Sequence, residues 1–214
     1  MAIKGLFLPG YACTSQIWQL IREELSSICE PTWVDWPIQV TPNFHSVDDF
    51  ADWLHGFAGM EQYKFIVGHS LGGLVALRLV EKAESADPKV ILIETFLTPP
   101  APFFQNLFQH EALSVQAKAI LEMLSHDKVH YSPILGDRLR GVDIREWVIK
   151  RGKKLYAIYG DRGCGAPEKV LNELQWSENL LDCVEVTVIP NACHFPMVEN
   201  PNATLKGLRR VLNL

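Results

Sequence analysis

The chain has 214 residues, of which 48 % are hydrophobic and 21 % charged, and its formal net charge is −5 at pH 7. This length suits one α/β domain with a large core and is short for two domains. The negative charge argues against nucleic-acid binding, and no apolar run approaches the roughly 18 residues that a membrane helix requires. We therefore expect neither a nucleic-acid partner nor a membrane partner.

The first residues lead directly into an apolar run, which leaves no room for a signal peptide. The five cysteines are an odd number without C-x-x-C spacing, a pattern typical of reduced thiols rather than of disulfides or a metal knuckle. We expect a cytoplasmic protein without a metal or another cofactor.

Strand-like and helix-like segments alternate along the chain. The expected strands are short apolar runs, at Ile3–Leu8, Thr32–Trp36, Phe65–Val67, Val90–Leu97, Leu155–Tyr159 and Val184–Ile189. The expected helices carry apolar residues at helical spacing, at Ile17–Leu25, Ser46–Ala58, Leu71–Lys82, Glu168–Leu180 and Ala203–Leu212. This alternation predicts the α/β class, with a mostly parallel central sheet, helices on both faces, and a site at the carboxyl ends of the strands.

Residues 98–153 interrupt the alternation. They contain two helical patterns, around Glu111–Leu124 and Arg145–Lys150, and a simple crossover needs less chain. We expect a crossover helix plus a small helical lid, inserted between core segments 1–97 and 154–214. Apolar residues at the start of this insertion either line a substrate pocket or pack the lid onto the body: Phe103, Phe104, Leu107 and Phe108.

A G-x-S-x-G motif centred on Ser70 joins the expected strand Phe65–Val67 to the expected helix Leu71–Lys82. Such a strand–turn–helix needs small residues at Gly68 and Gly72, because the strand and helix approach closely and the serine adopts strained dihedrals. A phosphate-binding loop would need Gly-Lys-Ser/Thr, and a dinucleotide site would need G-x-G-x-x-G; this motif is neither. It predicts that Ser70 is a nucleophile at the N-terminus of a helix.

Over nearly its whole length the chain resembles the α/β-hydrolase superfamily. The segment Leu6–Trp18 is similar to the family's oxyanion loop, in which a His-Gly pair precedes an aromatic residue and a Trp follows eight positions after the Gly. Here Pro9 replaces the His, and Trp18 occupies the position expected for the Trp. The resemblance implies that the backbone N–H groups of Tyr11 and Leu71 bind an oxyanion.

The segment His194–Pro201 resembles the family's H-x-P-x-x-E-x-P motif, with Cys193 in place of the usual preceding Gly. The resemblance implies that His194 follows the last strand and reaches Ser70. There it would act as a general base that takes the serine proton and returns it to the leaving group.

The sequence departs from the family pattern G-x-x-D-x-x-x-P at the position of the catalytic acid, which is Gly163 here. One candidate is Asp161, two residues earlier. The other is Glu94, at the end of the strand after the Ser70 helix, where one branch of the haloalkane dehalogenases carries its acid. Either choice keeps the chain order Ser, acid, His, and a dyad without an acid is the third possibility. A dehalogenase itself is not expected, since its nucleophile would be Asp rather than Ser70.

The resemblance implies a serine hydrolase that cleaves a carboxylic ester or thioester through an acyl-enzyme. Among subfamilies, the short chain and small lid are most similar to pimeloyl-acyl-carrier-protein methyl ester esterases. The alternatives are a lyase or acyltransferase on the same triad, or a non-catalytic ligand-binding module. A local excess of Lys and Arg between Arg138 and Lys154 is either a solvated surface or a docking patch for an acyl carrier protein.

Overall fold

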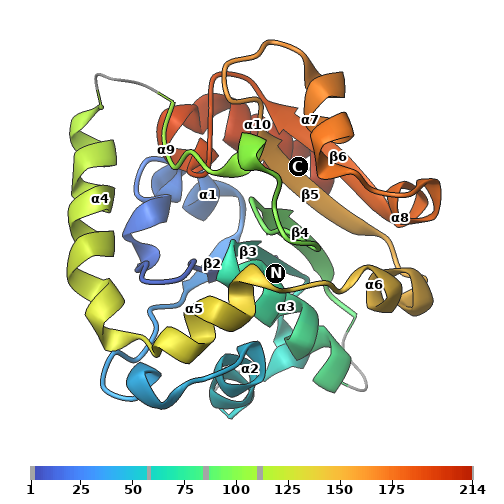
Figure 1. Cartoon of the computed structure of the whole chain (residues 1–214). Helices are drawn as coiled ribbons and strands as arrows, with labels where there is room; N and C mark the ends of the chain where they lie inside the picture. The colour runs from blue at the N-terminus through green and yellow to red at the C-terminus, as the bar shows by residue number, and fades with distance from the viewer. Residues whose placement is uncertain (1–2, 57–58, 84–86, 110–112, 214) are drawn as a thin grey trace.

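The computed structural model describes residues 3–56, 59–83, 87–109 and 113–213. Within these ranges a six-stranded parallel sheet forms the centre of the molecule, in the order β2-β1-β3-β4-β5-β6 (Figure 1). The strands are β1 (Lys4–Leu8), β2 (Glu30–Trp33), β3 (Phe65–His69), β4 (Lys89–Ile93), β5 (Leu155–Gly160) and β6 (Val184–Ile189). The predicted α/β architecture with a parallel sheet is confirmed.

Helices connect the strands and cover both faces of the sheet. The α-helices are α1 (Arg22–Ile28), α2 (Val47–His55), α3 (Leu71–Lys82), α4 (Val115–Asp127), α5 (Pro133–Arg140), α6 (Arg145–Arg151), α7 (Pro167–Leu174), α8 (Glu178–Cys183), α9 (Pro196–Glu199) and α10 (Pro201–Leu212). Short 3₁₀ helices are η1 (Ser15–Trp18), η2 (Thr41–Asn43), η3 (Met60–Gln62), η4 (Pro102–Phe104) and η5 (Lys128–His130). Ser46 caps α2, in a capping box with Asp49.

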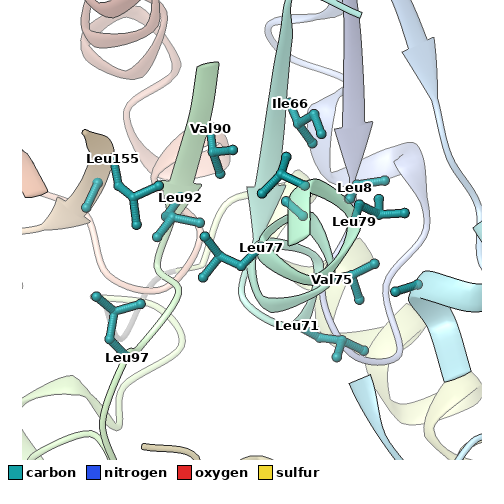
Figure 2. Close-up of a cluster of buried hydrophobic side chains, with 14 of the residues drawn as sticks. Leu8, Ile66, Leu71, Val75, Leu77, Leu79, Val90, Leu92, Leu97 and Leu155 are labelled. Atoms are coloured by element: carbon teal, nitrogen blue, oxygen red, sulfur yellow. The ribbon is translucent and has the colours of Figure 1, made fainter. Parts of the chain in front are cut away.

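Successive strand residues point to opposite faces of the sheet, and each face has its own apolar core. Strand residues Leu8, Ile66 and Leu92 of the first core lie beside α3 in Figure 2, which also labels Val90 and Leu155 of the same core. Their sequence neighbours enter the second core with residues of α1 and α10: Phe7, Phe65, Val67, Ile91 and Ile93. Both faces are therefore buried, which explains why the strands read as continuous apolar runs.

Several expected boundaries are wrong. The expected helix Ile17–Leu25 is divided between η1 and α1. The expected helix Glu168–Leu180 is divided into α7 and α8, because Gln175 adopts a left-handed conformation (φ 52°) that ends α7.

Strands β2 and β4 end at Trp33 and Ile93, before the expected Trp36 and Leu97. The expected helices at Ser46–Ala58 and Glu111–Leu124 extend into residues 57–58 and 111–112, which lie outside the described residues.

Segment 98–153 carries η4, α4, η5, α5 and α6, of which α5 was not predicted. In Figure 1, α4 lies beside the region of α1 and α9, while α5 lies near α2 and α3. Leu135 of α5 and Val148 of α6 are buried in the first core. Helices α5 and α6 thus pack on the side of the sheet that α3 covers, whereas Ile120 and Met123 of α4 belong to the second core. The role of the segment as a lid stays a prediction.

Candidate active site

Ser70 lies between β3 and α3, with φ 51° and ψ −118°. This left-handed backbone costs about 1–3 kcal/mol in a residue other than glycine and persists only where the surroundings hold it. The Ser70 N–H donates to the carbonyl of Ile93 (2.9 Å), and the hydroxyl of Thr95 donates to the Ser70 carbonyl (3.0 Å). The end of β4 thus fixes the turn.

The glycines around Ser70 allow the close approach that the motif predicts. A Cβ atom on Gly68 would lie 2.4 Å from the backbone of Gly72 and Gly73. A Cβ atom on Gly72 would lie 2.4 Å from the carbonyl oxygen of Leu8. Both distances are impossible for a real side chain, so the requirement for glycine at these two positions is confirmed.

The loop after β1 passes directly beside Ser70. A Cβ atom on Gly10 would lie only 3.2 Å from the Ser70 Cβ atom. The next residue is Tyr11, and neither its backbone N–H nor that of Leu71 donates a hydrogen bond to another residue in the described ranges. Trp36, which sequence reasoning missed, donates its indole N–H to the carbonyls of Pro9 (3.1 Å) and Gly10 (3.3 Å).

The other side of this loop contacts segment 98–153. The ring of Tyr131 lies 4.7 Å from that of Tyr11 and is stacked on Phe50 at 6.3 Å, measured between ring centroids. The backbone N–H and the hydroxyl of Thr14 point to the sulfur of Met123 in α4, at 3.4 and 3.3 Å. The loop is therefore held between the sheet and the insertion.

His194 follows β6 and lies next to the Ser70 turn. Its carbonyl accepts a hydrogen bond from Nε2 of His69 (2.8 Å), the residue that precedes Ser70, and the two imidazole centroids are 4.9 Å apart. Burial and the neighbouring charge of His194 lower the pKa of His69 well below its ordinary value. His69 is therefore a neutral core residue that ties the histidine loop to the serine turn.

Glu94 follows β4, with a left-handed backbone (φ 48°) and a side chain that is 0 % exposed. Its Oε2 lies 3.5 Å from Nδ1 of His194, whose side chain is 15 % exposed. The second partner of the carboxylate is the guanidinium of Arg162. Burial alone would raise the pKa of Glu94, but Arg162 and His194 outweigh it, so the pKa is lowered and the group is ionised.

Asp161 is also buried, but its carboxylate binds backbone amides of its own loop and of the loop after β6. Oδ1 accepts the backbone N–H groups of Gly163 (2.8 Å) and Asn191 (2.7 Å), and Oδ2 accepts that of Gly165 (3.1 Å). Of the two acid candidates, the structure thus brings Glu94 to His194 and engages Asp161 with backbone amides.

The rest of the histidine motif supports the local turn. Glu199 accepts the backbone N–H groups of Cys193 (2.6 Å) and Gln109 (2.8 Å), and Asn200 caps α10. Burial and the nearby Glu199 raise the pKa of the Cys193 thiol to about 12, so this thiol is protonated at neutral pH. All five cysteines are free.

The phenylalanines expected at a pocket occupy packed positions. Phe104 is buried against Phe96 and Tyr159, and it lines a cavity of about 390 Å³ on the η4 side. Phe103 packs edge-on against Phe104. Phe108 is stacked on Phe195, with centroids 5.1 Å apart.

A larger cavity of about 850 Å³ lies between α3 and helices α5 and α6. Leu74 and Leu77 of α3 line one side of it, and Leu135 and Leu139 of α5 line the other. Leu74 is four residues beyond Ser70, about one helical turn or 6 Å along the axis. No local sequence signal pointed to this cavity, because α5 itself was not predicted.

The basic excess between Arg138 and Lys154 is largely neutralised in the structure. Arg140 pairs with Asp137, Arg145 with Asp143, and Lys154 with Glu185. Arg151 and Lys153 both lie near Asp87. These pairs do not support a docking patch for an acyl carrier protein.

Across the described ranges, no three or more His, Cys, Asp or Glu side chains are placed to share a metal ion. None of the helices in the described part of the chain is both long and apolar enough to span a membrane.

The model of the alpha/beta hydrolase family matches residues 6–206. The chain belongs to this family. Members of this family carry their nucleophile, acid and histidine in that order along the chain. No curated protein sequence matches the chain.

Solved structures with the same fold include three hydrolases. The chain is 18 % identical to a thermophilic esterase from Thermogutta terrifontis, covering 100 % of this chain and 90 % of that one, with a TM-score of 0.74. An esterase from Exiguobacterium antarcticum is 13 % identical, with coverage of 100 % and 94 % and a TM-score of 0.73. A bacterial membrane phospholipase A is 17 % identical, with coverage of 99 % and 79 % and a TM-score of 0.71. The family supports a hydrolase enzyme, and these neighbours share its fold.

Proposed function

We propose that this protein is a serine hydrolase that cleaves a carboxylic ester or thioester through an acyl-enzyme on Ser70. The observation that carries the proposal is the strained Ser70 turn, with φ 51°, at the N-terminus of α3 and beside the His194 loop. A strained, partly exposed serine of this kind at the carboxyl edge of a parallel sheet fits a nucleophile. A turn that only connects a strand to a helix does not require a strained serine.

In this mechanism His194 takes the proton of the Ser70 hydroxyl as the oxygen attacks the substrate carbonyl. The Glu94 carboxylate, 3.5 Å from Nδ1, orients the imidazole and stabilises its charged form. The backbone N–H groups of Tyr11 and Leu71 stabilise the oxyanion of the tetrahedral intermediate, and both are free of partners among the described residues. His194 then protonates the leaving group, and water attacks the acyl-enzyme by the same route in reverse.

We assign the acyl part of the substrate to the cavity of about 850 Å³ between α3 and α5. Its volume lies within the range of ligand pockets. The leucines of α3 and α5 in its walls favour an aliphatic or aromatic group, and charged side chains such as Arg78 and Glu146 line it as well. The α3 side of the cavity starts one turn beyond Ser70, within reach of a chain esterified to that serine.

A fluorophosphonate probe tests the proposal directly. We expect the probe to add to Ser70, as mapped by mass spectrometry, and the Ser70→Ala variant to lose labelling. The same variant should lose on the order of 10⁴ to 10⁶ in kcat for short p-nitrophenyl esters, because members of a triad act as a unit. Ser27→Ala, which alters an exposed serine in α1, is the matched control.

Each other result redirects the assignment. Turnover above about a tenth of wild type in Ser70→Ala would remove the nucleophile role. A protein that labels at Ser70 but hydrolyses no ester or thioester would favour a lyase or acyltransferase. A folded protein that fails to label would favour a ligand-binding module.

A further inference from the structure

Arg162 occupies an unusual place for a cation. It lies in the loop after β5 with a left-handed backbone (φ 54°), and its side chain is only 4 % exposed. The guanidinium carbon lies 4.6 Å from the centroid of the Phe104 ring. Burying a cation is costly unless it is paired, so its partners must account for this position.

Those partners centre on Glu94. Nη1 of Arg162 donates to Oε1 (2.7 Å) and to the carbonyl of Gly160 (2.7 Å), while Nη2 donates to Oε2 (2.5 Å). A planar guanidinium that binds both oxygens fixes the plane of the carboxylate as well as its charge.

The remaining partners of Glu94 follow from this orientation. Oε1 accepts the Gly160 N–H (2.6 Å), and Oε2 faces Nδ1 of His194 at 3.5 Å. Oε2 is therefore shared between the guanidinium of Arg162 and the imidazole of His194. Oε1 is fully occupied without contacting His194.

The strand order makes this arrangement possible. Ile93 of β4 is paired with Ile158 of β5, so the residues that follow the two strands meet at one edge of the sheet. Arg162 comes from the loop where the family usually carries its acid, and it reaches across to an acid on the neighbouring strand.

We infer that Arg162 is a positioning residue, which holds the Glu94 carboxylate on His194 and offsets part of the negative charge that His194 experiences. This inference rests on the proposed function, in which Glu94 and His194 belong to the triad. Arg162 touches neither reacting atom and acts through Glu94.

The charge of Arg162 has a predictable effect on proton binding. Arg162 is a fixed positive charge beside the Glu94–His194 pair, and a positive charge there disfavours the binding of a further proton. Removing the cation should make the pair keep its proton to higher pH. Other titratable groups near this pair stay unchanged in the variants below: His69, Tyr159, Asp161, Cys193 and Glu199.

The test compares Arg162→Met, Arg162→Lys and wild type with a short p-nitrophenyl ester across pH. We expect Arg162→Met to move the acid limb of the kcat/KM profile up by about 0.5 to 1 pH unit. It should also lower kcat about tenfold to a hundredfold, with little change in KM, since the misplaced carboxylate affects chemistry more than binding. Arg162→Lys keeps the charge but loses the two-point contact, so its acid limb should stay near that of wild type while kcat falls.

Two further variants separate this role from a loss of folding. Arg209→Met removes an arginine of α10 that pairs with Glu24 of α1, and it should leave the pH profile of kcat/KM unchanged. The double variant Glu94→Gln/Arg162→Met removes both charges together, which avoids leaving one buried charge unpaired. Its kcat should match that of Glu94→Gln alone, because Arg162 acts only through Glu94.

The outcomes are distinct. An unshifted acid limb in Arg162→Met, or losses that multiply in the double variant, would overturn the positioning role while leaving the hydrolase proposal intact. If Arg162→Met does not fold, the pH profile of Arg162→Lys and the kcat of the double variant still decide whether Arg162 is a positioning residue. A wild-type protein that neither labels at Ser70 nor hydrolyses esters would instead remove the proposed function.

Discussion

At the scale of single residues, the two acid candidates differ in what their carboxylates contact. Glu94 lies against the imidazole of His194 and the guanidinium of Arg162, whereas Asp161 accepts backbone amides of its own loop and of the loop after β6. A carboxylate beside an imidazole affects proton transfer, and a carboxylate that binds amides affects the stability of its loop. Mutation of Glu94 should therefore lower kcat, and mutation of Asp161 should mainly lower stability.

We expect Glu94→Gln to lower kcat by about 10⁴, because the amide no longer holds the imidazole in the productive tautomer. Asp161→Asn should lower kcat much less and mainly reduce the melting temperature, because it weakens the contacts with the amides of Gly163, Gly165 and Asn191. Steady-state kinetics and thermal unfolding of both variants measure the two effects.

The reverse ranking in kcat would give the acid role to Asp161. Near-normal turnover in both variants would mean that Ser70 and His194 work as a dyad.

At the scale of elements, the sequence predicted the parts that depend on local chemistry. The Ser70 turn needs glycines at fixed spacing, and the strand and helix on either side of it are strongly apolar, so the motif identifies the turn by itself. The apolar strands were found because both faces of a parallel sheet are buried. The choice between Glu94 and Asp161 remained open because it depends on which strands are neighbours, and that is a long-range property.

Contacts between distant segments also limited the prediction of segment 98–153. Helix α5 has the start signals Ser132 and Pro133, but Gly136 and the charged residues of Pro133–Arg140 obscure its apolar face. Without α5 the cavity above α3 could not be predicted, and the phenylalanines near η4 were the only apolar candidates for a pocket. Trp36 and Tyr131 were also missed, because their contacts with the loop after β1 join segments far apart in the chain.

The cavity leads to a prediction about chain length. Leu139 of α5 lines the cavity and is half-buried, so Leu139→Trp should fill part of the space without disturbing the sheet. We expect kcat/KM for a p-nitrophenyl ester of a long fatty acid to fall about tenfold or more relative to that for the acetate. Ile134→Trp, on the same helix at an exposed position, is the control and should leave this ratio unchanged. An unchanged ratio in Leu139→Trp would place the acyl group outside this cavity.

At the scale of the whole molecule, the site depends on several separate segments meeting at one edge of the sheet. Ser70 follows β3, Glu94 follows β4, Arg162 follows β5 and His194 follows β6. His69 links two of these segments, through its hydrogen bond to the His194 carbonyl, and it does so in the neutral form. The stability of the fold and the assembly of the site are therefore coupled through a buried titratable group.

This coupling predicts how stability changes with pH. In the unfolded chain His69 takes up a proton near about pH 6.5, whereas burial, aided by the charge of His194, lowers its pKa in the folded protein. The unfolded state therefore binds more protons below that pH. The free energy of unfolding should fall as pH decreases, by up to about 1.4 kcal/mol per pH unit from this group. Glu94 has a lowered pKa and adds to the loss only in more acidic solution, while Glu199, with a raised pKa, opposes it there.

Urea unfolding at about pH 8, 6 and 5 measures this slope. His69→Gln keeps a side-chain N–H donor for the His194 carbonyl but does not titrate in this range, so it should flatten the dependence below about pH 6.5. His126→Gln, which changes an exposed histidine at the end of α4, is the control and should keep the wild-type slope. Equal slopes in wild type and His69→Gln would show that the folded protein tolerates a proton on His69, and the neutral link between the serine and histidine loops would then be wrong.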